Sequence, residues 1–358
     1  ACLSGRIFPP GGAYVFRGEA CMFLSARQGR VRRVLFLLCA LCALQLLLFP
    51  RPATEAVAQA LQLCADTIIP SLFPFLALSA LLTALFPTGA ASAPPLAKLS
   101  RTLFRVRPAG LLVLALGFTG GYPVGVRTAA AFYSAGRLSR AETLRLLAFC
   151  NNSGPGFLLG VVGLDVFHSS AVGLVLYAVH IASALLAGLL FRFYAPQEAP
   201  CRSRSTAAPE GNPPSLSALF TAGVTSSFTA VLQICAFVLF FMVVLRMLAV
   251  SGILALLCTA LTYLLAPLGM TEQLSCALLA GFLELSTGSA CLRGAALSPL
   301  TAALSAFLLG WGGLSVHCQS LLFLQAAHLP CRTYLCGKLL QGLLSAVLAA
   351  ALFSGLCP

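Results

Sequence analysis

Long stretches of apolar residues follow one another along almost the whole chain, and this pattern constrains the fold more than any other feature. Hydrophobic residues make up 59% of the 358 residues and charged residues only 9%, with a mean hydropathy of +0.96. Soluble domains carry about 25% charged residues, and a helix needs about 20 apolar residues to cross a bilayer. The chain is therefore predicted to be an all-α integral membrane protein, with the lipid bilayer as its first partner.

Basic residues outnumber acidic ones and have a particular distribution. The chain has 22 Lys and Arg against 9 Asp and Glu, a net charge of +13, and most of the basic residues lie between apolar runs. Membrane proteins gather Lys and Arg in their cytoplasmic loops, so this charge is interpreted as an orientation signal. No nucleic acid partner is predicted.

The predicted membrane segments are separated by polar or Gly-rich breaks. They cover residues 34–49, 64–86, 109–138, 143–164, 169–191, 219–248, 252–268, 274–297, 300–325 and 335–355. Four of them are interrupted, in chain order by GFTGGYPVG, NNSGPG, ELSTG and GWGG. The interruptions occur in the same order in two halves, and paired Gly-interrupted segments at matching places point to a transport site.

Charge indicates how the interrupted segments lie. If 109–138 is a hairpin that enters and leaves on one side, nearly all the Lys and Arg between apolar runs, including Lys338, fall in the cytoplasm. Each half then crosses the membrane an odd number of times, so the second half is inverted. The prediction is two inverted repeats, each with a re-entrant hairpin and a broken helix, in all about seven spans plus two hairpins. Residues 93–106 are predicted to lie at the interface, and 252–268 either there or across the membrane.

Five segments follow from this division. They are an N-terminal flank (1–33), an extra N-terminal span (34–50), the first inverted repeat (51–192), a polar cytoplasmic linker (193–218) and the second inverted repeat (219–358). Residues 1–21 show no helical or strand pattern, and Met22 is interpreted as the start of the native chain. The run at 34–49 is predicted to be an uncleaved signal anchor, with a cleaved signal peptide as the alternative.

The 15 cysteines are interpreted as packing residues. Those in apolar runs include Cys39, Cys42, Cys64, Cys150, Cys235, Cys258 and Cys318. None forms a paired array with metal-ligand spacing, and buried Cys behaves as a small hydrophobic residue. Neither a zinc site nor a disulfide framework is predicted.

The first candidate binding element is CNNSGPG at residues 150–156. Pro155 removes a backbone donor within an apolar run, and the polar backbone groups set free there need partners that lipid does not supply. The residues predicted to bind a solute or an ion are Asn151, Asn152, Ser153 and Gly154. The alternative is a proline kink at which the Asn side chains join neighbouring helices.

The second candidate element is GFTGGYPVGVR at residues 117–127, a predicted hairpin tip. Gly120 and Gly121 permit a tight turn before Tyr122, and helix N-termini at such a tip attract anions. Arg127 adds a positive charge at membrane depth and is predicted to bind an anionic solute. Its alternatives are snorkelling to the interface or neutralising Glu284.

The matching tip is GFLELSTGS at residues 281–289. A carboxylate at the depth of Glu284 costs on the order of 3 kcal/mol and requires a cation, a proton or an Arg. Glu284 is therefore predicted to hold a coupling Na⁺ or H⁺, with Ser286, Thr287 and Gly288 in the same site.

Other polar residues carry weaker signals. Asp66 is interpreted as interfacial, and His180 and His317 as packing residues, with a proton role for His317 as the alternative. No catalytic, metal-ligand or cofactor motif occurs, so neither an enzyme nor a bound metal is predicted.

The motifs IIPSLFPF, GYPVG, CNNSGPGFLLGVVG and GFLELSTG resemble those of the YlbJ family of sporulation integral membrane proteins, over roughly residues 34–355. That family belongs to the nucleoside-recognition or gate group, which is related in architecture to concentrative nucleoside transporters. The resemblance implies transport of a small organic anion, dipicolinic acid, across the outer forespore membrane during endospore formation. The second half departs from the pattern because GWGG lacks the Asn pair.

Three functions stay open at this stage. They are a dipicolinate-type anion transporter, a nucleoside or other small-solute transporter of the same architecture, and a non-transporting scaffold of spore assembly. The sequence leaves the coupling ion, the transport direction and the presence of a homo-oligomer undecided, because fold does not fix function.

Overall fold

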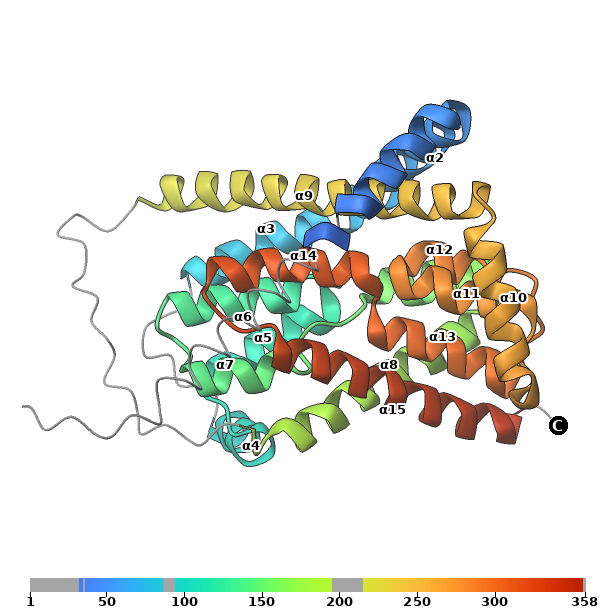
Figure 1. The fold of residues 1–358 in the computed structure, drawn as a ribbon. Helices are drawn as coiled ribbons and strands as arrows, with labels where there is room; N and C mark the ends of the chain where they lie inside the picture. The colour runs from blue at the N-terminus through green and yellow to red at the C-terminus, as the bar shows by residue number, and fades with distance from the viewer. Residues whose placement is uncertain (1–31, 35, 86–93, 195–214, 357–358) are drawn as a thin grey trace, which may run out of the picture.

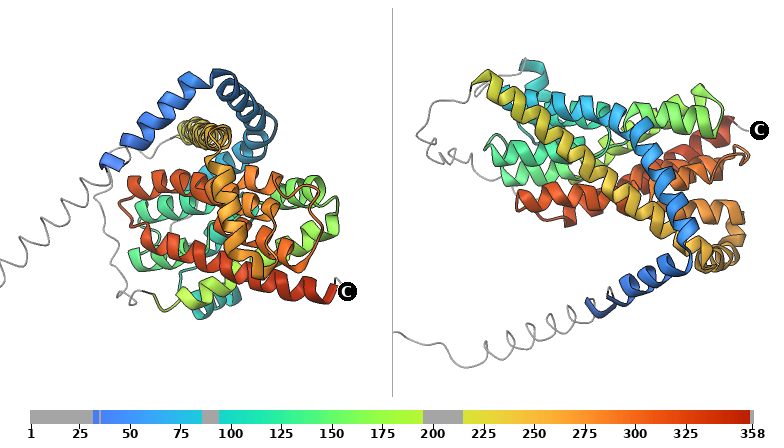
Figure 2. Two further views of the ribbon diagram at one scale, coloured as in Figure 1. Left: turned by 45° about the vertical axis from the view of Figure 1, so that its right-hand side comes forward. Right: turned by 90° about the horizontal axis from the view of Figure 1, so that it is seen from above.

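The computed structural model describes residues 32–34, 36–85, 94–194 and 215–356, and the regular structure in these ranges is helical. The predictions for the stretch before residue 32, including Met22 as the native start, lie outside the described residues, as does most of the polar linker (195–214). A helix over residues 36–48 precedes the labelled elements. Figure 2 shows it projecting from the bundle, and its apolar side chains are largely exposed.

The first half contains one long helical path, a hairpin and a broken helix. Its elements are α2 (Pro50–Leu63), η1 (Cys64–Ile68), α3 (Ile69–Leu85), α4 (Pro94–Phe104), α5 (Ala109–Thr119), α6 (Val124–Ser134), α7 (Arg140–Leu147), η2 (Gly156–Val166) and α8 (Ser170–Phe191). The path formed by α2, η1 and α3 begins at Pro50, whereas the span was predicted to begin at residue 64. Pro50 is favourable there because the first turn of a helix needs no backbone donor.

The second half repeats this order. Its elements are α9 (Leu216–Val250), α10 (Ile253–Leu265), η3 (Ala266–Leu268), α11 (Glu272–Leu283), α12 (Leu285–Ala290), α13 (Pro299–Trp311), α14 (Gly313–Ala326) and α15 (Arg332–Leu356). Thus α9 corresponds to α2–α3, the pair α11–α12 to the hairpin α5–α6, the pair α13–α14 to α7–η2, and α15 to α8.

The two halves are oriented in opposite directions. In Figure 1, α9 runs from the end of the molecule where α5, α6 and α7 lie to the end where α10, α11 and α12 lie, while α2–α3 runs the other way. Helices α8 and α15 are likewise antiparallel and in contact. Figure 2, seen from above, shows α9 and α2–α3 crossing over one face of the remaining bundle. The predicted membrane fold of inverted halves is confirmed.

Several helices have the length and composition of membrane spans. Four qualify alone in the described ranges, namely α8, α9, α13–α14 and α15. Counting each of three bent pairs as one span raises the number to 7. One bent pair is α10–η3 with α11, which turns by 116°, and another is α4 with α5, which turns by 75°. The segment at 252–268, left open between an interfacial and a spanning position, therefore turns sharply into the second hairpin as α4 turns into the first.

Glycines allow the hairpin α5–α6 to close on the broken helix. A Cβ at Gly117 or at Gly125 would lie 1.9 Å from the backbone oxygen of Cys150, and a Cβ at Gly337 of α15 would lie 2.2 Å from that of Ala148. Side-chain carbons do not approach backbone atoms so closely, so only Gly fits at these three positions. The irregular segment between α7 and η2 is thereby enclosed by protein, as non-helical backbone at membrane depth requires.

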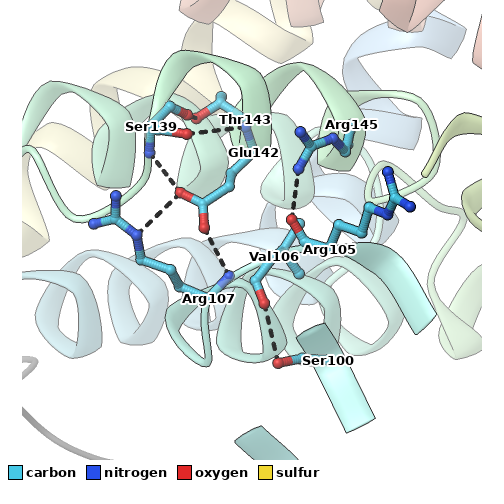
Figure 3. A network of polar contacts seen from close by, with 8 residues as sticks. All are labelled: Ser100, Arg105, Val106, Arg107, Ser139, Glu142, Thr143 and Arg145. Atoms are coloured by element: carbon cyan, nitrogen blue, oxygen red, sulfur yellow. Dashed lines mark hydrogen bonds and ion pairs between the residues drawn. The ribbon is translucent and has the colours of Figure 1, made fainter. Parts of the chain in front are cut away.

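Polar contacts fix the entrance of the first hairpin. Glu142 accepts hydrogen bonds from the backbone N–H of Ser139 at 2.8 Å and of Arg107 at 2.9 Å, and it forms an ion pair with the Arg107 side chain at 3.2 Å (Figure 3). The buried Arg145 donates to the carbonyl of Arg105 at 2.5 Å. These contacts join the loop before α5 to α7, so both ends of the hairpin are held on one side.

One disulfide corrects the interpretation of the cysteines. Cys258 of α10 is bonded to Cys276 of α11, with the two Cα atoms 5.2 Å apart. The sequence reading treated Cys258 as a packing residue because the 116° turn that brings α10 and α11 together has no signature in cysteine spacing.

Candidate functional site

A cavity of about 530 Å³ lies where the two halves meet. Its wall comes from the kinked region η1–α3, the tip of the hairpin α5–α6, the start of η2, the middle of α9, and the second-half elements α12 and α14. Apolar side chains make up much of this wall, including Leu72, Phe75, Phe157, Ile234 and Val316. Such a cavity, mostly apolar with a few convergent polar groups, is typical of a small-molecule site.

Seven of the twelve residues predicted from the sequence line this cavity. They are Gly120, Gly121, Tyr122, Ser153, Gly154, Glu284 and Ser286. Arg127, Asn151, Asn152, Thr287 and Gly288 do not line it, and Asp66, which was interpreted as interfacial, does. The tips of both hairpins and the break of the first half therefore share one space.

The first hairpin tip contacts both broken helices. Gly121 has φ +77°, a conformation that side chains other than Gly rarely adopt, and a Cβ there would lie 3.2 Å from the amide nitrogen of Gly154. A Cβ at Gly312, in the break of the second half, would lie 3.3 Å from the Tyr122 ring. The Tyr122 hydroxyl donates to the carbonyl of Leu309 at 2.7 Å. Because Gly312 ends α13, that carbonyl belongs to the last turn, where carbonyls lack helical partners.

The two Asn residues hold the broken helix and are not among the residues that line the cavity, so their direct contact with a solute stays a prediction. Asn151 Nδ2 donates to Ser320 Oγ at 3.1 Å, and Asn152 Oδ1 accepts from Gln341 Nε2 at 2.8 Å. Asn152 Nδ2 also donates to the Phe149 carbonyl at 2.8 Å. Both side chains are fully buried, so their amides satisfy the irregular backbone and tie it to α14 and α15.

Arg127 also lies away from the cavity. Its guanidinium donates to the Leu76 carbonyl at 3.1 Å, to Ser227 Oγ at 3.2 Å and to Ser226 Oγ at 3.4 Å. These groups are on α3 and α9, so Arg127 anchors α6 to the long helices. Neither direct binding of a solute in this cavity nor neutralisation of Glu284 fits this position.

Glu284 is buried and caps the short helix α12. Its Oε1 accepts from the amide of Ser286 at 3.0 Å, and its Oε2 accepts from the amide of Thr287 at 2.7 Å and from Thr287 Oγ1 at 2.8 Å. These bonds satisfy amide groups at the start of α12 that have no partner within the helix. Thr287 thus holds the Glu284 carboxylate through two hydrogen bonds, while Glu284 and Ser286 line the cavity.

Lys338 is the functional candidate that the sequence analysis missed. It was assigned to the cytoplasm, but it is fully buried within α15. Its ammonium donates to the Tyr122 hydroxyl at 2.8 Å, to the Asn151 carbonyl at 2.8 Å and to Gln341 Oε1 at 2.7 Å. Its position in the sequence could have revealed it. Lys338 lies six residues after Arg332, where α15 begins, and an apolar run follows it, so it falls inside the helix and not in the preceding loop.

The two histidines in spans have partly satisfied surroundings. His180 Nε2 accepts from the amide of Ser153 at 3.1 Å, and His317 Nδ1 lies 3.0 Å from the Tyr334 hydroxyl. The His317 ring packs edge-on against Trp311 at 4.3 Å. Both contacts support the packing interpretation.

Charge in the cavity wall is acidic. Asp66 and Glu284 are its ionisable carboxylates, and among the described lining residues there is no Lys, Arg or His. A polar strip of Glu284, Ser286, Ser315 and Gln319 faces the apolar part of the wall, with Gln319 Nε2 donating to Ser315 Oγ at 3.2 Å. Across the described ranges, no group of three or more His, Cys, Asp or Glu is arranged to hold a metal ion.

Comparisons with known proteins give one curated relative and one solved structure. The sporulation integral membrane protein YlbJ of Bacillus subtilis (strain 168) is 30% identical over 323 residues, which are 86% of this chain and 79% of the relative. A structure described as CNTnw in an inward-facing substrate-bound state aligns with a TM-score of 0.40 and 16% identity, over 93% of this chain and 86% of that one. No family model matches the chain.

Proposed function

We propose, from the premise that the chain belongs to the YlbJ family of sporulation integral membrane proteins, that it transports a small organic anion during endospore formation. One observation carries the proposal. Two hairpin tips and a broken helix, contributed by oppositely oriented halves, line a single cavity of about 530 Å³. Inverted halves that share a site at the break of their helices are the arrangement by which many transporters alternate access.

A scaffold has no need of such a cavity. Irregular backbone at membrane depth is costly unless protein or water satisfies it, and here it is held by the dedicated side chains Asn151, Asn152 and Lys338. A solute that enters the cavity explains why this arrangement is maintained. Transport is therefore favoured over a purely structural role.

The solute that we propose is a small aromatic dicarboxylate of the dipicolinate type. The start of η2, at Gly154, Pro155, Gly156 and Phe157, forms part of the wall, and helix N-termini attract carboxylates. Tyr122, also in the wall, accepts a hydrogen bond from the Lys338 ammonium. The Glu284 charge is directed to the amides of α12, which reduces its repulsion of an anion. The Phe75 and Phe157 rings suit a planar ring.

A second candidate is a neutral polar solute such as a nucleoside. The polar strip of Glu284, Ser286, Ser315 and Gln319 offers several acceptors, and no basic side chain is among the described lining residues. Hydroxyl and amine groups on a solute would be recognised by such acceptors. This alternative predicts that nucleosides compete with, or replace, the dicarboxylate.

Coupling and location complete the proposal. We assign a coupling Na⁺ or H⁺ to Glu284, the buried carboxylate that faces the cavity. The proposed location is the outer forespore membrane, and assembly as a homo-oligomer is compatible with the exposed apolar surface of α9.

The test is uptake into proteoliposomes reconstituted with the purified full chain. Radiolabelled dipicolinate should accumulate above the level of empty liposomes, and excess unlabelled dipicolinate should abolish the signal. Inhibition by uridine or adenosine at comparable concentration, together with uptake of those nucleosides, would favour the second candidate. If neither dipicolinate nor nucleosides are taken up, both transport hypotheses are wrong and the scaffold hypothesis is supported.

A further inference from the structure

The hydrogen bonds around Lys338 favour one of its two protonation states. Three groups surround Nζ, and each one must accept a hydrogen bond. The Asn151 carbonyl has no hydrogen to donate, and the Tyr122 hydroxyl gives its hydrogen to the Leu309 carbonyl. The Gln341 amide nitrogen donates to Asn152 Oδ1 and to the His180 carbonyl, so its oxygen is the atom that faces Lys338.

Three acceptors need three N–H groups. A neutral amine has two, whereas an ammonium has three and no acceptor site. The ammonium is therefore the form of Lys338 that satisfies this environment. A positive charge stands at a fully buried point on α15, beside the break of the first half.

This charge has no anionic partner in the described part of the chain. The ion pairs found in the described ranges are Arg107 with Glu142 and Arg246 with Glu55, and neither of them includes Lys338. An unpaired charge in a low-dielectric interior is costly, and such residues within a membrane protein are functional candidates. The ammonium would be stabilised by any anion that comes close.

The cavity gives an anion a place beside Tyr122, the residue that accepts a hydrogen bond from Lys338. Tyr122 lies between the two, since its ring centroid is 4.8 Å from Nζ and the same residue lines the cavity. An anion bound against Tyr122 would be separated from the ammonium by about one ring. Arg127, the cation suspected from the sequence, points toward α3 and α9 instead.

We propose that Lys338 is the counter-charge that makes this site select dicarboxylates, acting through Tyr122 without touching the solute. The inference rests on the proposed function, because it supplies the positive charge that anion transport through this cavity requires. Lys338 is in this sense a specificity-determining residue, and its effect should grow with the negative charge of the solute.

A charge series of solutes tests this directly. Purified full-length protein is titrated with pyridine-2,6-dicarboxylate, pyridine-2-carboxylate and neutral pyridine-2,6-dicarboxamide, and the three Kd values are compared between wild type and Lys338→Gln. The substitution should raise the Kd of the dicarboxylate by about a hundredfold and the Kd of the monocarboxylate by about tenfold, because each negative charge on the solute loses its attraction to Lys338 separately. The Kd of the neutral diamide should change little.

The design separates charge from structure. If Lys338 had a purely structural role, the substitution would weaken the binding of all three ligands equally, and that result would overturn the inference. Lys338→Arg should keep the order of affinities, and Arg246→Gln, which removes a half-exposed cation that does not line the cavity, should leave all three unchanged. In Lys338→Ala, added methylammonium should restore dicarboxylate binding, whereas the larger tetramethylammonium should not.

The proposed function fails differently. If wild type binds neither carboxylate, anion transport by this site is wrong and the counter-charge role falls with it. If wild type binds the dicarboxylate and Lys338→Gln retains the same ratio of affinities across the series, the proposed function stands and the inference alone is refuted.

Discussion

Substitution of Gly125 by Ala is expected to push the first hairpin away from the backbone of Cys150. A Cβ at this position would lie 1.9 Å from the carbonyl oxygen and 2.6 Å from the carbonyl carbon of Cys150. Both are backbone atoms, so no side chain can rotate aside, and α6 must move by about 1 Å or more to restore van der Waals contact. The hydrogen bond from Lys338 to the next carbonyl, that of Asn151, is only 2.8 Å long and would stretch with the displacement.

The magnitude follows from these two effects. Overpacking in a close-packed interior costs about 1–3 kcal/mol, and each weakened hydrogen bond adds about 1 kcal/mol. Gly125→Ala should therefore destabilise the protein by about 2–4 kcal/mol, and dipicolinate uptake should fall sharply because Gly121 and Tyr122 belong to the same hairpin. The measurements are the unfolding midpoint in detergent and the initial rate of uptake in proteoliposomes.

A matched control is available in η2. A Cβ at Gly160 would meet no atom within 4 Å, so Gly160→Ala should leave both the unfolding midpoint and the uptake rate near those of wild type. A Gly125→Ala protein that unfolds at the wild-type temperature and transports at the wild-type rate would refute the close contact between the hairpin and Cys150.

Three further predictions concern coupling, the broken helix and topology. Glu284→Gln should preserve folding, because an amide oxygen can still cap α12, while solute uptake loses its dependence on a Na⁺ or pH gradient; retained dependence would exclude Glu284 as the coupling group. Asn152→Ala should lower affinity about tenfold by freeing Gln341 from its partner, a loss of roughly 1.4 kcal/mol, and unchanged affinity in a binding titration would argue against this brace. Cysteine-accessibility labelling in a cysteine-free background should place residues 87–108 and 135–145 on the same cytoplasmic face, and opposite faces would rule out a re-entrant first hairpin.

The interruptions of the helices were predictable from sequence because they depend on local chemistry. Gly and Pro at membrane depth break helices whatever surrounds them, so the tips at Gly120–Gly121 and Glu284 and the breaks at 150–156 and Gly312 lie where the motifs placed them. The inverted order followed from the same breaks and from the side on which most Lys and Arg fall.

The direction of individual side chains was not predictable in the same way. The positive-inside rule treats each Lys as a loop residue, and it placed Lys338 outside the membrane core although that residue lies within α15. Arg127 and the Asn pair were recognised as polar groups at unusual depth, but on a helix a rotation of one residue decides whether a side chain faces a cavity or a neighbour. That rotation is set by the packing of α6 against α3 and α9, which depends on the whole fold.

The unequal breaks of the two halves have a consequence for movement. The break of the first half is braced by Lys338, Asn151 and Asn152, which tie it to helices of the second half. The break of the second half is a pair of glycines with φ +88° and +82°, against which the Tyr122 ring rests. The two breaks are therefore built differently: side-chain hydrogen bonds to the other half hold the first, and left-handed glycine backbone forms the second. Any movement that inverts the molecule must exchange bonds at the first break, whereas at the second it can proceed by backbone rotation at two residues without side chains.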